Sequence, residues 1–287
     1  MKYLVIGAGG QLGKQWVSEL ESLDVEFTAL NRKALDISDR SAIRKVLEQE
    51  KPQVLVNCAA YTKVDQAEDE PEKAELINGV APGVIADICA QKNIKLIHYS
   101  TDYVFRGSEE DEQKYPTGYP EDAPTDPVNE YGKSKLMGES AIVNSGADHL
   151  IIRVSWLCGE FGNNFVKTML RLGSERDELS VVNDQVGCPA FTKPVVNNTL
   201  QLIRSSKQGI FHLRSAGRIT WFDLASAIFK EKYINVSLNA VSSEAFPSKA
   251  KRPNFSLLGI EKAKAVEGVI INDWKSDLSE MLNNLSE

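Results

Sequence analysis

The stretch Asn129–Lys135 reads Asn-Glu-Tyr-Gly-Lys-Ser-Lys and carries a tyrosine and a lysine four residues apart. On a helix, Tyr131 and Lys135 would lie on one face, with Cβ atoms about 5–6 Å apart. A cation beside a phenol favours the phenolate, so we expect Lys135 to lower the pKa of Tyr131 from about 10. Such a tyrosine can give or take a proton near neutral pH. The same spacing also occurs by chance on exposed helix faces, so the rest of the chain must show whether this pair is catalytic.

A glycine-rich turn follows the first apolar segment of the chain. Residues 3–6 form a continuous apolar run, typical of a strand buried on both faces of a parallel sheet, and a helical pattern runs from Lys14 to Leu23. Between them, Gly7, Gly10 and Gly13 allow a tight turn and the close approach of a diphosphate to a helix N-terminus. This order predicts a dinucleotide site, although a plain strand–helix turn uses the same residues.

The second apolar run, residues 25–30, predicts another strand and ends at Asn31 and Arg32. An acidic residue at this place would bind the adenosine ribose of NAD. Here a neutral residue is followed by a cation, so Arg32 could pair with the 2′-phosphate of NADP. The alternative is a solvated arginine.

The following segments continue the alternation of strands and helices. We predict helices at 40–49 and 72–92 and strands at 54–60, 95–102 and 149–156. Asn78, midway along the second helix, either bonds to backbone or supports the site. Thr101 and Asp102 close the strand at 95–102, and open α/β sheets bind ligands at that end of their strands.

The second half of the chain is less regular. Residues 106–130 are rich in acids and prolines and predict a long loop of the kind that forms lids or binding loops. Further on, we predict a strand at 209–213 and an amphipathic helix at 221–231 opened by Thr220. The predicted fold is α/β, a Rossmann-type doubly wound parallel sheet over residues 1–157, to which some later segments return. Residues 158–287 mainly form a smaller, partly interleaved substrate-binding domain.

Composition narrows the class of protein. The 287 residues include 42% apolar and 25% charged side chains, ordinary values for a globular protein, and the net charge of −7 argues against binding to nucleic acid or to an anionic membrane. The four cysteines are too scattered for a disulfide framework or a zinc site, so we expect no bound metal. We find no signal-peptide pattern and no apolar run near the roughly 20 residues of a membrane span, so we expect a cytoplasmic protein.

Several strings in this sequence together resemble those of one enzyme family. They are Gly7–Gly13, Leu35–Asp39, Asn57–Glu68, Tyr99–Phe105, Asn129–Lys135, Arg153–Leu157, Gly162–Leu170, Val182–Gln185 and Arg252–Pro253. The chain thereby resembles the extended short-chain dehydrogenase/reductases, and within them the dTDP-4-dehydrorhamnose reductases, nearly from end to end. The resemblance implies NADPH-dependent reduction of the C4 keto group of dTDP-4-dehydro-6-deoxy-L-mannose to dTDP-L-rhamnose, a precursor of cell wall polysaccharide or lipopolysaccharide.

The resemblance also implies residue roles. Tyr131 would donate a proton to the C4 carbonyl, Thr101 would orient that carbonyl, and Lys135 would lower the pKa of Tyr131 and bind the nicotinamide ribose. Substrate contacts would come from Thr101, Asp102, Trp156, Asn164 and Arg252. The cofactor site would be formed by Gly7, Gly10, Gln11, Leu12, Gly13, Asn31, Arg32, Asp36, Ile37, Ala60, Tyr61, Thr62, Tyr99, Tyr131 and Lys135.

The chain departs from the family pattern at a few positions. Val154 stands where threonine is usual, Cys188 replaces a smaller residue before proline, and Gln15 stands where many members carry glutamate. Some members are described as dimers with Mg²⁺, so a homodimer is an expectation, while the loss of that carboxylate weakens the expectation of Mg²⁺. NADPH is the expected cofactor, with NADH as a possible second.

Two other functions stay open. One is a related 4-ketoreductase or an epimerase acting on another nucleotide sugar. The other is a non-catalytic regulatory subunit of the methionine adenosyltransferase type, which loss of the tyrosine or lysine would favour; both are present. A dTDP-sugar carries two negative charges, and the cations Lys249, Lys251 and Arg252 could meet them, unless they form only a solvated surface.

Overall fold

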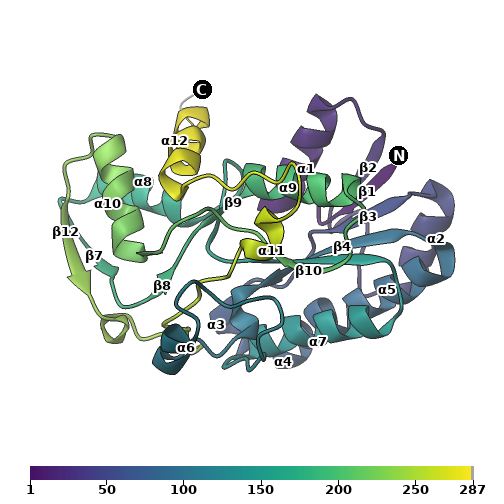
Figure 1. The fold of residues 1–287 in the computed structure, drawn as a ribbon, viewed down its shortest axis with the longest axis horizontal. Helices are drawn as coiled ribbons and strands as arrows, with labels where there is room; N and C mark the ends of the chain where they lie inside the picture. The colour runs from purple at the N-terminus through teal and green to yellow at the C-terminus, as the bar shows by residue number, and fades with distance from the viewer. Residues whose placement is uncertain (286–287) are drawn as a thin grey trace.

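The central sheet has six parallel strands, in the order β10-β5-β4-β3-β1-β2, in a computed structural model that describes residues 1–285. Figure 1 shows this sheet in the middle of the molecule, with helices on both sides. The strands are β1 (Tyr3–Ile6), β2 (Phe27–Leu30), β3 (Val54–Asn57), β4 (Lys95–Thr101), β5 (His149–Val154) and β10 (Gly209–His212). This is the predicted Rossmann-type arrangement, and the last strand comes from the second half of the chain.

Two layers of helices bury the two faces of the sheet (Figure 1). Successive residues of a strand point to opposite faces, so Val5 packs with Trp16 on one face while Leu4 packs with Ile43 on the other. The first layer contains α1 (Gln11–Ser22) and α9 (Thr192–Arg204), with the short α11 (Glu261–Lys264). The second contains α2 (Arg40–Glu50), α5 (Ala81–Lys92) and α7 (Glu130–Asn144). Burial on both faces explains the continuous apolar runs of the strands.

Most predicted elements are present, with shifted ends. The first helix begins at Gln11 rather than Lys14, and the second strand begins at Phe27 rather than Val25. Strands β3, β4 and β5 end at Asn57, Thr101 and Val154, before the predicted ends at 60, 102 and 156. The predicted helix at 72–92 is continuous in space but consists of α4 (Pro71–Glu75), a π-helical turn (Leu76–Val80) and α5.

The remaining elements form a second body, seen beyond the carboxyl edge of the sheet in Figure 1. Its core includes Phe191, Leu224, Phe229 and Leu278. The elements are β6 (Leu157–Cys158), α8 (Phe165–Glu175), β7 (Glu178–Val182), β8 (Val186–Gly187), β9 (Ala190–Phe191), β11 (Ile219–Thr220), α10 (Trp221–Glu231), β12 (Ser237–Val241) and α12 (Trp274–Asn284). The predicted helix opened by Thr220 is confirmed, with a capping box between Thr220 and Asp223.

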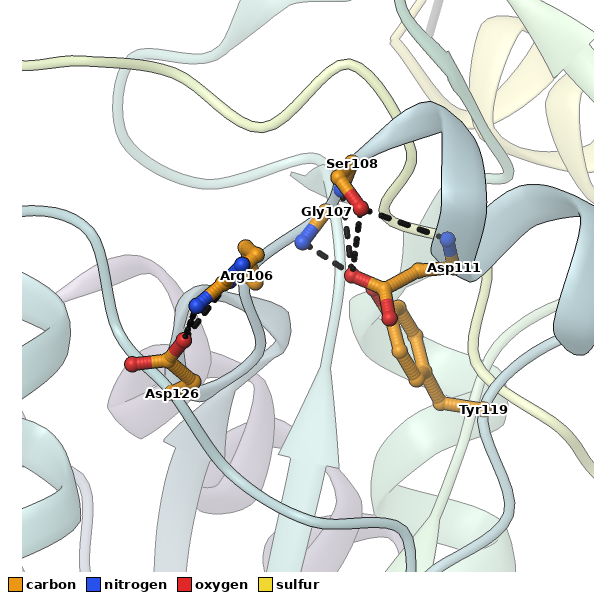
Figure 2. A network of polar contacts seen from close by, with 6 residues as sticks. All are labelled: Arg106, Gly107, Ser108, Asp111, Tyr119 and Asp126. Atoms are coloured by element: carbon orange, nitrogen blue, oxygen red, sulfur yellow. Dashed lines mark hydrogen bonds and ion pairs between the residues drawn. The ribbon is translucent and has the colours of Figure 1, made fainter.

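The loop at 106–130 is held by its own polar network, drawn in Figure 2. Ser108 and Asp111 form a capping box that starts a short helix, α6 (Glu109–Lys114), which we had not predicted. The hydroxyl of Tyr119 accepts the backbone N–H of Gly107 at 3.0 Å. The carbonyl of Gly107 in turn accepts the N–H groups of Asn254 and Phe255, so the loop is tied to the C-terminal segment.

Candidate active site

A cleft of about 720 Å³ lies at the carboxyl edge of the sheet. Strand β1 pairs with β2 on one side and with β3 on the other, so the connections leaving β1 and β2 run in opposite directions across the sheet. Such a switch in strand order opens a crevice, where doubly wound sheets bind nucleotides. The cleft is lined by Gly7, Gly10 and Asn31 among others.

Two of the predicted glycines are required by close backbone contacts. Gly7 has φ of +75°, and a Cβ there would lie 2.4 Å from the Ala59 nitrogen. A Cβ on Gly13 would lie 2.3 Å from the Gly7 carbonyl oxygen. These contacts bring α1 against the end of β1, with the free N–H groups of its first turn at the cleft, which suits a diphosphate.

The predicted adenosine end of the site is assembled in the same cleft. Arg32, Asp36 and Ile37 line it together with Asn31, and Ala60 and Tyr61 close its other side. The Asn31 carboxamide accepts the N–H groups of Lys33 and Ala34, and so shapes the turn that presents Arg32. Hydrogen bonds from Ser38 lower the pKa of Asp36.

Four residues that we expect to bind cofactor or substrate also make contacts that hold elements of the fold together. Leu12 is buried in the core, and Gln11 donates to the Leu157 carbonyl. The Tyr99 hydroxyl is bonded to Trp16 and Thr199, on the side of the sheet away from α7. Asn164 caps α8, and its amide also donates to Gln11 at 2.7 Å. Thr62, which we also expect at the cofactor, is exposed.

The helix that carries Tyr131 and Lys135 is placed by its cap and its glycines. Asn129 accepts the Gly132 N–H at 2.8 Å and donates to the Lys251 carbonyl. A Cβ on Gly132 would lie 2.2 Å from the Tyr103 carbonyl oxygen, and one on Gly138 would lie 2.1 Å from that of Asn78. The predicted i, i+4 pair therefore sits on a helix pressed against the residues that follow β4.

Tyr131, Thr101 and Asp102 form one connected group. Thr101 donates to Asp102 at 2.9 Å and accepts the Tyr103 N–H at 3.2 Å, while its hydroxyl also bonds to that of Tyr131. Burial raises the pKa of Tyr131 above its usual value, and the bond to Thr101 opposes this. Burial also raises the pKa of Asp102 to about 7. The predicted catalytic Thr101 and Tyr131 thus meet at the end of β4.

The expected effect of Lys135 on Tyr131 was wrong in direction. The Lys135 nitrogen donates to the Tyr99 carbonyl at 2.6 Å and lies 3.2 Å from His98 Nε2. With these partners the cation does not offset the burial of the phenol, so the pKa of Tyr131 rises rather than falls. Burial likewise lowers the pKa of Lys135 itself, to about 8.

The Asn78 side chain is satisfied mainly by backbone groups, one of the two roles considered for it. Its side-chain oxygen accepts the Tyr61 N–H at 2.8 Å, and its nitrogen donates to the Tyr61 carbonyl and to Ser134 Oγ. The π-helical turn around Asn78 places this amide between the loop after β3 and helix α7. Tyr61 and Tyr131 are thereby held in one framework.

Two of the residues that we expect to bind substrate, Arg252 and Trp156, are held by aromatic and polar neighbours. Arg252 pairs with Asp65 at 2.7 Å and reaches the hydroxyl of Tyr103, whose ring packs edge-on against Tyr131. Trp156 has φ of +49°, stacks on Trp221 at 3.8 Å and donates to Ser256. Sequence reasoning missed Trp221, which joins the site only through the second body.

The Gln15 side chain is held by hydrogen bonds within the protein. Its carboxamide is buried, donates to Glu19 and accepts from Thr192. Among residues 1–285, no three His, Cys, Asp or Glu side chains are grouped so as to hold a metal ion. The same described residues include no helix long and apolar enough to cross a membrane.

Two buried polar residues beside the site were also missed. Asn57 ends β3 and His98 lies in β4, and both are buried. They are register partners in the sheet, and His98 contacts Lys135. A polar residue inside an otherwise apolar strand was the available signal.

The fold and this site define a nucleotide-dependent enzyme of the short-chain dehydrogenase/reductase kind, and comparison with known proteins identifies its family. The chain belongs to the family described as the RmlD substrate binding domain, whose model matches residues 1–287. It is 38% identical to a spore coat polysaccharide biosynthesis protein of Bacillus subtilis, over 99% of this chain and 98% of that protein.

It is also 38% identical to the dTDP-4-dehydrorhamnose reductase of Shigella flexneri, again over 99% and 98% of the two chains. Among solved structures, it is similar to a dTDP-4-dehydrorhamnose reductase of Bacillus anthracis in complex with NADP. That match has a TM-score of 0.93, 36% identity and 99% coverage of both chains.

Proposed function

We propose that this protein reduces the C4 keto group of dTDP-4-dehydro-6-deoxy-L-mannose with NADPH, giving dTDP-L-rhamnose. The observation that carries the proposal is the group formed by Thr101, Tyr131 and Lys135 at the end of β4, beside a nucleotide-sized cleft. Relatives named for this reaction, one of them bound to NADP, support it.

The residues of the cleft fit NADPH. The close approach of Gly7 and Gly13 leaves room for a diphosphate at the start of α1. Arg32 stands where a guanidinium can pair with the 2′-phosphate, and NADH, which lacks that phosphate, would bind more weakly. When bound, the cofactor supplies the hydride that attacks C4.

Tyr131 then acts as the general acid. Its raised pKa keeps the phenol protonated at neutral pH, so it can give its proton to the C4 oxygen as negative charge develops there. Thr101 holds the phenol in place through its hydroxyl, and Asp102 orients Thr101. Lys135 would bind ribose hydroxyls and exchange a proton behind Tyr131.

The substrate nucleotide fits the other side of Tyr131. Arg252 can offer its guanidinium to a diphosphate oxygen, and Trp156 offers an aromatic face. Asp102 has one carboxylate oxygen without a hydrogen-bond partner among the described residues, which suits a sugar hydroxyl. We include the dTDP-sugar as the substrate, a homodimer as the assembly and the cytoplasm as the location in this proposal.

The test is an assay of the purified protein with dTDP-4-dehydrorhamnose and NADPH, following nicotinamide absorbance and identifying the sugar product. Tyr131→Phe should keep cofactor binding and lose about 10²–10⁴-fold in turnover. Tyr103→Phe is the matched control, since it removes a neighbouring phenol and should lose far less. Turnover of Tyr131→Phe within a factor of two of the parent would remove Tyr131 from its role.

The same assay separates the other functions. A parent protein that reduces only the C3 and C5 epimers of this sugar, such as dTDP-4-dehydro-6-deoxy-D-glucose, would be a related 4-ketoreductase. A parent that binds NADPH but turns over no 4-keto sugar would fit the regulatory alternative.

A further inference from the structure

A line of buried polar groups runs behind the proposed active site, from β3 through β4 to α7. Asn57 and His98 face each other across the sheet, with Asn57 Nδ2 3.1 Å from His98 Nδ1. On the other side of the ring, His98 Nε2 lies 3.2 Å from Lys135 Nζ. All three side chains are at most 2% exposed, so each hydrogen bond must be satisfied within the protein.

The direction of these hydrogen bonds is fixed by a backbone group. The Ala59 N–H lies 3.0 Å from Asn57 Oδ1, and a backbone N–H can only donate. The oxygen of Asn57 is therefore on that side, and its NH₂ group points to His98. Because the amide donates, His98 Nδ1 must accept.

A neutral imidazole carries one N–H, so in His98 it is on Nε2. The ring is neutral because burial lowers the pKa of His98 well below its usual value. This N–H points directly at the Lys135 nitrogen.

Lys135 can accept that N–H in only one of its two forms. An ammonium has three donors and no acceptor, whereas a neutral amine has two donors and a lone pair. One donor is used by the Tyr99 carbonyl at 2.6 Å. If Lys135 were an ammonium, one of its N–H groups and the Nε2–H of His98 would face each other across 3.2 Å. If it is an amine, its lone pair accepts the Nε2–H, and each of these groups has a partner.

We propose that Asn57 fixes His98 as its Nε2–H form and that His98 thereby favours the neutral amine of Lys135. Asn57 and His98 are then positioning residues, which act on the reaction only through Lys135. This proposal builds on the proposed reductase function, but it concerns the proton on Lys135 and can be tested without turnover.

The other charges near Lys135 do not reverse this effect. Burial is the main cause that lowers its pKa to about 8, and Glu139 of α7 opposes it. Glu139 is bound by the guanidinium of Arg153 on β5 through three hydrogen bonds, so its charge is largely met elsewhere. Lys135 thus exchanges a proton close to neutral pH, where an ordinary lysine would be a permanent cation.

The first experiment is nitrogen NMR of the histidine rings in the parent protein, with His98 assigned by its loss in His98→Phe. We expect the proton of His98 on Nε2 and no protonation of the ring above about pH 6, near the ordinary histidine pKa. A proton on Nδ1 would overturn the proposal, whatever the protein's activity.

The second experiment reverses the orientation of the His98 hydrogen bonds, so that the ring accepts from Lys135. In Asn57→Asp, one carboxylate oxygen can still accept the Ala59 N–H while the other accepts from His98 Nδ1. The ring then turns its Nε2 lone pair to Lys135 and stabilises the ammonium. We expect the pKa of Lys135, followed by carbon NMR of its Cε, to rise by about one unit, a tenfold change in its protonation equilibrium.

Asn57→Asp also adds a negative charge, which could raise the Lys135 pKa by itself. The same substitution is therefore measured in the His98→Phe background. If His98 mediates the effect, the increase from Asn57→Asp should shrink by at least half there. An equal increase in both backgrounds would mean that charge alone acts, and an unchanged Lys135 pKa in Asn57→Asp would also overturn the proposal. Failure of the reductase assay alone would leave these readings, and so this proposal, standing.

Discussion

The carboxyl group of Asp102 is buried, and burial disfavours its charged form. The free energy of unfolding should therefore depend on pH in an unusual way. The side chain is 3% exposed, one oxygen is bonded to Thr101, and the other has no partner among residues 1–285. Burial raises the pKa from 3.8 to about 7. In the folded protein the group therefore holds a proton between about pH 4 and 7 that it releases when the chain unfolds.

The sign of the effect follows from this difference. Since the folded state binds the extra proton, the free energy of unfolding falls as pH rises through that window. A shift from 3.8 to about 7 is about 3 units, or about 4 kcal/mol in full, and about 2–3 kcal/mol of it falls between about pH 5 and 8. Asp102→Asn removes the titration, so its stability relative to the parent should increase by that amount over this range.

The assay is denaturant unfolding of both proteins at matched pH values, compared as a difference so that all other groups cancel. Asp39→Asn is a control of opposite sign. Hydrogen bonds at the start of α2 lower the pKa of Asp39, so removing its charge should cost more at high pH than at low pH. Parallel pH curves for the parent and Asp102→Asn would refute the reasoning. If ionisation of Asp102 is shown to lower the free energy of unfolding, the carboxylate is retained for binding rather than for folding.

Three further predictions concern the cofactor, the substrate and the fold. Arg32→Ala should raise KM for NADPH and leave KM for NADH nearly unchanged in steady-state assays; equal effects would make Arg32 structural. Arg252→Ala should weaken dTDP binding in calorimetry by about 1.5–3 kcal/mol, the range for hydrogen bonds to charged groups, with Lys249→Ala as a weaker control. Gly138→Ala places a Cβ 2.1 Å from the Asn78 carbonyl oxygen and should lower unfolding free energy by about 1–3 kcal/mol; an unchanged urea midpoint would contradict this close contact.

Local patterns predicted the elements whose signals lie within a few residues. Thr220 and Asp223 are three residues apart, and the helix that they cap begins where it was expected. Helix α6 carries the same kind of capping box at Ser108, but its four acidic residues resembled a charged loop. Helix α12 was missed although its buried residues, Leu278 and Leu282 among them, recur at helical spacing, and they face a body assembled from distant segments.

The spacing of Tyr131 and Lys135 predicted that both lie on one helix, but it did not predict the pKa direction of Tyr131. Spacing fixes where two Cβ atoms lie, while a lysine nitrogen ends several bonds away, wherever the fold provides an acceptor. That acceptor is the Tyr99 carbonyl in β4, so the pKa of Tyr131 depends on burial rather than on the cation. Asn164 likewise has a structural role that its place in the sequence did not reveal, because its side chain caps α8.

The line from Asn57 to Lys135 shows why proton chemistry is harder to predict than fold. Its residues come from separate parts of the sequence, and 41 positions separate Asn57 from His98. Only the β3–β4 register brings them together, and only the Ala59 N–H decides which way the amide points. An apolar pair at these positions would preserve the sheet and remove the control of Lys135. The chain keeps two buried polar groups at a desolvation cost, which is understandable if the proton on Lys135 has to move.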